Sequence, residues 1–194
     1  MKQSPKLPAE KRRGQLIAAA NRVFAAKGYT NATTEEIARV AGLTKGALYF
    51  HFNNKEDIFF TVVKEINAVH SRLLLQILEE EKNLEKVIEK ALLLSFEHIH
   101  KQKYFAVEFW EQVHKIPRIR EFLASEHRKL RNVVVCYLLA HSNLKKKECE
   151  SLFTLMNAVF DGIVIRQSCY RSKRELENAV LQLINMTKVY IRKK

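Results

Sequence analysis

Glycine, proline and cysteine are scarce in this sequence. The 194 residues include 5 glycines, 3 prolines and 3 cysteines. Glycine and proline mark the tight turns between strands, so their scarcity argues against long, turn-rich sheets. The three cysteines, Cys136, Cys149 and Cys169, are odd in number and widely spaced, which does not support a disulfide framework or a zinc ribbon. The composition therefore favours an all-α protein.

Long apolar runs and enzyme motifs are also missing. No apolar run approaches the roughly 20 residues that cross a bilayer. The first 14 residues are basic, but no apolar signal core follows them. We therefore expect a cytoplasmic protein without membrane contact. The sequence contains no phosphate-binding glycine loop, nucleophile elbow, zinc-helix motif or paired carboxylates, so it predicts no enzyme activity, catalytic residue, metal site or cofactor.

Positive charge is in clear excess. Lys and Arg number 34 against 21 Asp and Glu, which gives a formal net charge of +13 and a pI near 9.7. This charge favours a polyanion as partner. Charge alone does not choose between nucleic acid and an anionic membrane.

Hydrophobic residues recur with helical spacing along nearly the whole chain. Pairs of Ser or Thr and Glu three residues apart predict helix starts at Thr33 and Ser172, Asn54 is a further expected cap, and Gly28 should end the first helix. The pattern predicts an all-α fold of about nine helices, over residues 9–27, 34–41, 44–51, 55–80, 83–101, 104–113, 117–138, 144–167 and 173–191.

Residues 41–55 have the pattern of the turn and second helix of a helix-turn-helix. Gly42 supplies a left-handed backbone conformation, and Thr44 can cap the following helix. Leu48 is the expected inward residue of that helix. The remaining faces are then available for a DNA groove and its phosphates.

The span 15–58 resembles the N-terminal domain of TetR-family transcriptional regulators. The resemblance rests on ungapped matches at fixed spacing: Phe24, Gly28-Tyr29, Ile37-Ala38, Ala41-Gly42-Leu43-Thr44, Gly46, Leu48-Tyr49, His51-Phe52 and Lys55-Glu56. It implies a three-helix DNA-binding domain over 1–54 and a larger effector-binding and dimerisation domain over 55–194. It also implies a repressor that binds a palindromic operator as a homodimer and is released by a small, largely apolar effector.

The expected DNA contacts lie around the two helices of this motif. Lys45 is the best candidate for contacting guanine, Gly46 and Ala47 allow close approach to a thymine methyl, and Phe50 could touch thymine methyls or sugar. Glu35 departs from the family pattern because a carboxylate there would repel a phosphate. The predicted DNA-binding residues are Thr33, Thr34, Thr44, Lys45, Gly46, Ala47, Tyr49, Phe50, His51 and Lys55.

Predictions for the second domain rest on an aromatic cluster and a glycine. An effector pocket is expected around Phe96, Phe105, Phe109, Trp110, His114 and Tyr137, although aromatic residues at helical spacing are more often plain core. A glycine within a helix costs about 1 kcal/mol unless close packing needs it. A tight crossing of two protomers would explain Gly162, which places the predicted dimer interface at Phe160, Asp161 and Gly162.

Two alternatives to the specific repressor stay open. A basic protein that coats DNA would bind without sequence preference and with a steep dependence on salt. A redox-sensing regulator would use Cys136, Cys149 or Cys169.

Overall fold

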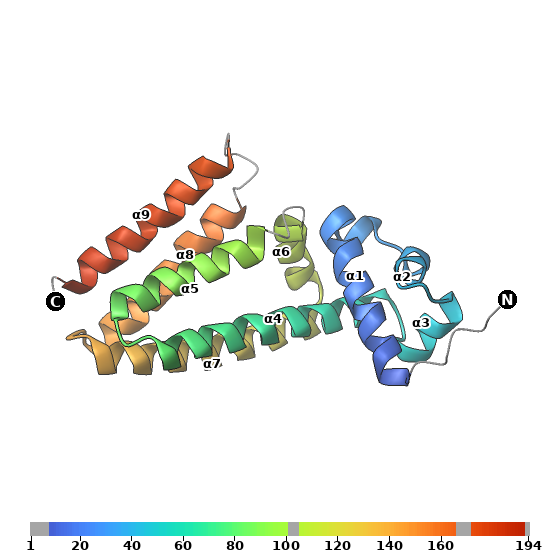
Figure 1. Ribbon diagram of the computed structural model, residues 1–194, viewed down its shortest axis with the longest axis horizontal. Coiled ribbons are helices and arrows are strands. Elements are labelled where there is room, and N and C mark those ends of the chain that lie inside the picture. The colour runs from blue at the N-terminus through green and yellow to red at the C-terminus, as the bar shows by residue number, and fades with distance from the viewer. Residues whose placement is uncertain (1–7, 101–104, 166–171, 193–194) are drawn as a thin grey trace.

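The computed structural model describes residues 8–100, 105–165 and 172–192. Within these residues the chain forms nine α-helices and no strand (Figure 1). This confirms the predicted all-α fold. The helices are α1 (Ala9–Asn31), α2 (Thr34–Val40), α3 (Lys45–His51), α4 (Lys55–Glu80), α5 (Leu84–His100), α6 (Phe105–Lys115), α7 (Pro117–His141), α8 (Lys146–Ile165) and α9 (Lys173–Arg192).

The expected caps stand at the starts of α2, α4 and α9. The Thr33 hydroxyl accepts the N–H of Glu36, 3.2 Å away, and the Asn54 side chain accepts the N–H of Asp57 at 2.8 Å. Ser172 caps α9 in the same way, at 3.2 Å from the backbone nitrogen of Glu175. Gly28 has φ +77° and interrupts α1 as predicted, but helical backbone resumes after it and continues to Asn31.

The N-terminal helices share one core with the beginning of α4. Its fully buried side chains include Leu16 of α1, Ile37 of α2 and Leu48 of α3. Phe24 and Phe59 meet edge to face at the centre, with ring centroids 5.3 Å apart. The same core also includes Val113 of α6, Ile119 of α7 and Ile116, which lies between these helices.

Helix α4 connects this core to the rest of the molecule. Its 26 residues span about 39 Å at 1.5 Å per residue. Figure 1 shows α4 running from the three N-terminal helices along the long axis of the molecule, beside α7 and α5. Residues 58–63 are buried in the N-terminal core, whereas Leu74 is buried farther along. Because one helix serves both parts, the division between residues 54 and 55 stays a prediction.

The second part packs α5, α7, α8 and α9 together. One buried cluster joins α5, α8 and α9 through side chains such as Leu92, Phe160 and Val180. Another joins α7 and α8 around Leu138 and Cys149. Within residues 8–100, 105–165 and 172–192, none of the helices combines the length and the apolar character needed to cross a membrane.

Candidate nucleic-acid interface and inner cavity

Helices α2 and α3 are joined by the tight turn that the sequence predicts. Gly42 has φ +69°, and its N–H donates to the carbonyl of Arg39 at 3.1 Å, while the N–H of Leu43 donates to Ala38 at 2.9 Å. The Thr44 hydroxyl then accepts the N–H of Ala47 at 3.1 Å and caps α3. These bonds satisfy the backbone at the turn and fix the angle between the two helices.

Helix α3 is held by one apolar side and exposes the others. Leu48 is fully buried in the N-terminal core, and Phe52 is buried just after the helix ends. Tyr49 is 44% exposed and Phe50 is 79% exposed. Among the described residues, Phe50 is the most exposed large hydrophobic side chain. Its ring meets the half-buried His51 ring edge to face, at a centroid distance of 5.0 Å.

A polar network crosses from α2 to α3. Thr34 is buried, and its hydroxyl oxygen lies 3.1 Å from the hydroxyl of Tyr49. The Thr34 hydroxyl donates to the Glu35 carboxylate at 3.1 Å, and the ammonium of Lys45 pairs with that carboxylate. The Lys45 nitrogen also lies 5.8 Å from the centre of the Tyr49 ring. Three predicted DNA-binding side chains, Thr34, Lys45 and Tyr49, are thus linked to one another through this network and Glu35.

The hydrogen bond from Lys45 to Glu35 shifts the pKa of both groups. The bond from Lys45 is the main cause that lowers the pKa of Glu35, with further hydrogen bonds from the backbone and Thr34. The same bond, with the charge of Glu35, raises the pKa of Lys45. Both groups are therefore charged at neutral pH.

Lys55 has partners inside the protein. Its ammonium donates to the carbonyls of Tyr29, Thr30 and Ala32 at 2.9, 3.3 and 3.0 Å. An ammonium has three protons, so these three carbonyls use them all. The phosphate contact of Lys55 stays a prediction, and it would require this ammonium to share or exchange its partners.

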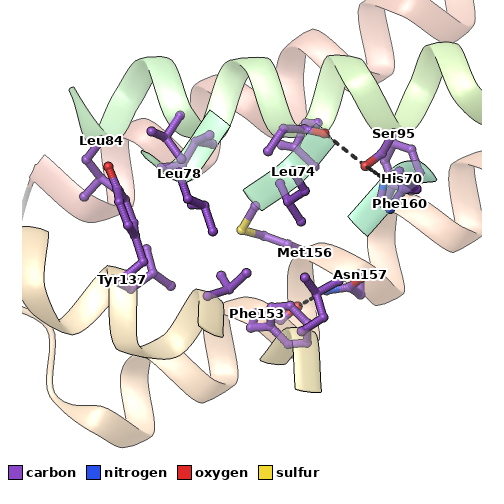
Figure 2. Close-up of a pocket in the computed structure, with 17 residues that line it drawn as sticks. His70, Leu74, Leu78, Leu84, Ser95, Tyr137, Phe153, Met156, Asn157 and Phe160 are labelled. Carbon is purple, nitrogen blue, oxygen red and sulfur yellow. Dashed lines mark hydrogen bonds between the residues drawn. The ribbon is translucent and has the colours of Figure 1, made fainter. Parts of the chain in front are cut away.

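A small apolar cavity lies in the second part of the chain, between α4, α5, α7 and α8. Its volume is about 110 Å³. Figure 2 shows Leu74, Leu78 and Met156 converging on it from α4 and α8. The lining residues are His70, Leu74, Leu78, Leu84, Val87, Ile88, Ala91, Leu92, Ser95, Leu130, Val134, Tyr137, Leu138, Phe153, Met156, Asn157 and Phe160.

Polar groups in the cavity wall are mostly engaged with one another or with the backbone. The Ser95 hydroxyl donates to the carbonyl of Ala91 at 2.9 Å, so the ring Nε2 of His70, also 2.9 Å away, is the donor in its bond to Ser95. The Tyr137 hydroxyl donates to the carbonyl of Glu81 at 3.0 Å. The 17 lining residues include no Asp, Glu, Lys or Arg.

Comparison with known proteins identifies the N-terminal region. The sequence profile of the family described as "Bacterial regulatory proteins, tetR family" matches residues 16–62. These residues coincide with α1 to α3 and the start of α4, whose helix-turn-helix geometry is described above. Residues 16–62 therefore match the DNA-binding region of the TetR family.

Individual relatives extend this comparison. The HTH-type transcriptional regulator TtgR of Pseudomonas putida is 38% identical over 65 residues, which are 34% of this chain and 31% of TtgR. The match thus spans about a third of that relative's length. The HTH-type transcriptional repressor AcnR of Corynebacterium diphtheriae is 25% identical over 179 residues, 89% of each chain. A regulator from Saccharomonospora viridis, solved with choline, shares the fold over 92% of this chain and 96% of its own, with TM-score 0.78 and 15% identity.

The residues predicted to bind an effector do not lie together. Tyr137 lines the cavity, whereas Phe109 and Trp110 pack against the N-terminal core. Phe96 is buried between α5 and α9, and His114 is exposed. The side chain of Phe105 lies outside the part of the chain that the structure describes. The helical spacing of these residues predicted that they would be buried. It could not predict which of the separate clusters of buried residues each of them would join.

The three residues predicted for the dimer interface differ in how deeply they are buried. Phe160 is buried within its own protomer and lines the cavity, and Asp161 is half-buried. An added methyl group on Gly162 would meet nothing within 4 Å. No close packing within the described protomer therefore requires this glycine. The contact of Phe160, Asp161 and Gly162 with a second protomer stays a prediction.

Two of the three cysteines are described. Cys136 is exposed and Cys149 is buried, and both are free thiols. Burial raises the pKa of Cys149, which disfavours its reactive thiolate. Cys169 lies outside the described residues.

Proposed function

We propose that the chain is a transcriptional repressor that binds a palindromic DNA operator as a homodimer and is released by a small apolar effector. The observation that carries the proposal is the exposed face of the capped α2–α3 unit, where Lys45, Tyr49 and Phe50 project beside the turn. In a helix-turn-helix this second helix enters the major groove. The net charge of +13 favours the approach to DNA.

A selection of bound sequences from a random duplex pool tests this proposal. We expect the native protein to recover an inverted repeat at physiological salt, with half-sites about one helical turn apart. A Lys45→Ala, Tyr49→Ala double variant should lose this consensus. Lys146→Ala, which removes an exposed charge at the start of α8, is the control and should keep it. If all three proteins retain DNA equally and recover no consensus, the chain binds DNA nonspecifically through its positive charge.

The proposed dimer would use α8 and α9. Leu155 and Val159 of α8 are exposed, and with Gly162 they follow one stripe of the helix at spacings of four and three residues. Met186 and Val189 form a second exposed pair on α9, and Met186 is 70% exposed. Exposed apolar stripes on neighbouring helices are typical of protein–protein contacts.

Sedimentation equilibrium tests the dimer. We expect the native protein to sediment as a dimer at micromolar concentration and Leu155→Glu to sediment as a monomer with unchanged helix content. Val133→Glu places the same charge on an exposed apolar position of α7 and should stay dimeric. A monomeric native protein would contradict this part of the proposal.

The cavity is the proposed effector site. Ligand pockets usually hold about 300–1,000 Å³, so a cavity of about 110 Å³ must widen when a ligand enters. Widening would move α4 away from α5, α7 or α8. Because Lys55 at the start of α4 is bonded to the segment before α2, such a movement would also shift the DNA-binding helices. By linkage, the effector and DNA must then weaken each other's binding by the same factor.

Straight-chain alcohols of six to twelve carbons are suitable neutral probes for this cavity. We expect the best of them to raise the melting temperature of the native protein and to release bound operator, since a ligand that binds the folded state stabilises it. Ala91→Leu would fill the cavity and should abolish both effects. Ala140→Leu makes the same change at an exposed position of α7 and should retain them. Identical melting shifts in the two variants would exclude this cavity as the binding site.

A further inference from the structure

Glu35 and Lys45 form an ion pair across the helix-turn-helix, on the face that we propose contacts DNA. Glu35 lies in the first turn of α2, and Lys45 is the first residue of α3. Their side chains are 57% and 54% exposed. The pair is therefore accessible to a ligand on both of its members.

The neighbouring hydroxyls fix how this pair is oriented. Thr34 donates its single hydroxyl proton to Glu35, so the Tyr49 hydroxyl must be the donor in its 3.1 Å bond to Thr34. One oxygen of Glu35 thus accepts from Thr34, and the other accepts from Lys45. The carboxylate is held from α2 and α3 together, which limits its rotation.

Pairing also removes the electrostatic objection to a carboxylate at a DNA interface. An isolated Glu35 would be repelled by phosphates, whereas the pair with Lys45 has no net charge. The ammonium has three protons and uses one on Glu35, so two donors are left for a ligand. The carboxylate offers about four acceptor positions, of which Thr34, Lys45 and its own backbone N–H use three, so one is left for a ligand. The pair consequently presents an acceptor and donors side by side.

We propose that Glu35 and Lys45 together recognise one C·G base pair in the major groove. The carboxylate accepts from the N4 amino group of cytosine, and the ammonium donates to O6 and N7 of guanine. A C·G pair presents one donor followed by two acceptors, which matches this arrangement. An A·T pair places its donor between two acceptors and ends in a methyl group, so Lys45 could reach only one acceptor beside Glu35.

This inference rests on the proposed function, because it assigns a base pair to the same interface. It makes Glu35 a specificity-determining residue. The sequence alone suggested only that this carboxylate repels phosphate. The structure adds the partner that turns it into a hydrogen-bond acceptor for a base.

The test compares selections from a random duplex pool for the native protein, Glu35→Gln and the charge-matched control Glu65→Gln, at an exposed position of α4. The native protein and the control should recover an inverted repeat with C·G at one fixed position in each half-site. Glu35→Gln should keep the repeat but lose C·G there, since a glutamine amide favours adenine. Discrimination between C·G and T·A at that position should fall about tenfold or more.

Binding measured at several salt concentrations separates recognition from a structural role. Glu35→Ala should free Lys45 for a phosphate, strengthen binding to scrambled duplex and steepen the salt dependence by about one charge per half-site. A purely structural Glu35 would instead lower the melting temperature and weaken binding to every duplex alike. That result, or an unchanged consensus for Glu35→Gln, would overturn the inference while the repressor proposal stands. A native protein that recovers no repeat would overturn both.

Discussion

The Glu108 carboxylate of α6 accepts the backbone N–H of Thr30 and lies over the α-carbon of Gly28. Lys55, at the start of α4, donates to three carbonyls of the same segment, residues 29–32. The connection between α1 and α2 is thus held by two helices that also extend toward the second part of the chain. Glu108 therefore connects the segment between α1 and α2 to α6, and Lys55 connects it to α4.

Gly28→Ala should destabilise the protein. The residue has φ +77°, which costs an L-amino acid about 1–2 kcal/mol. A Cβ there would also lie 1.7 Å from the nearer Glu108 oxygen. We expect the free energy of unfolding, measured by urea denaturation, to fall by about 2 kcal/mol or more.

Gly14→Ala is the matched control for that substitution. Gly14 lies in α1, and an added methyl group would meet nothing within 4 Å. Alanine should therefore raise the free energy of unfolding by up to about 1 kcal/mol, because it is the better helix former. Equal effects of the two substitutions would contradict the geometry assigned to Gly28.

Lys55→Met should lower stability, and it also tests the predicted phosphate contact of Lys55. Methionine keeps an apolar chain of similar length but donates no hydrogen bond, so three carbonyls lose a charged donor. We expect a loss of about 2 kcal/mol in the free energy of unfolding. Binding titrations at several salt concentrations test the phosphate contact separately. A slope reduced by about one charge per protomer would support the contact, and the native slope would exclude it.

The local features of the fold could be predicted from the sequence, whereas contacts between distant residues could not. Caps such as Thr33, Thr44 and Asn54 depend on residues three positions away, and the structure contains each of these bonds. Periodicity likewise located the buried side of α3. The pair of Glu35 with Lys45 joins separate helices, and nothing in their spacing indicates it.

The cavity illustrates the same limit. Its wall combines side chains of α4, α5, α7 and α8, from His70 to Phe160, and each of them has the spacing of ordinary core residues. Which apolar residues surround a cavity depends on the angles between helices. Those angles result from packing across the whole second part, so aromatic content alone directed attention to Phe109 and Trp110, which pack elsewhere.

Phe50 should make DNA binding sensitive to a thymine methyl. An exposed phenylalanine on α3 can cover that methyl, and burying one such group contributes about 0.8 kcal/mol. Replacing the contacted thymidine by deoxyuridine in each half-site should weaken native binding several-fold, as measured by fluorescence anisotropy. Phe50→Ala should not distinguish the two duplexes. Val133→Ala, at an exposed position of α7, should behave as the native protein does. If the native protein binds the thymidine and deoxyuridine duplexes with equal affinity at every thymine position, this role for Phe50 is wrong.

Asp161 should make stability depend on pH. Burial raises the pKa of this carboxyl from 3.8 to about 6. Because the folded state binds the proton more tightly, the stabilisation is complete below the unfolded pKa and is lost as the pH rises through 6. The charged form then costs up to about 3 kcal/mol at pH 7. Asp161→Asn removes this ionisation. The free energy of unfolding of the variant minus that of the native protein should therefore increase between pH 4 and 7 and stay constant above that range. Urea denaturation at fixed protomer concentration measures the difference, with Glu65→Gln as the control for loss of one exposed carboxylate. A difference that stays constant over this range would show that Asp161 does not titrate there.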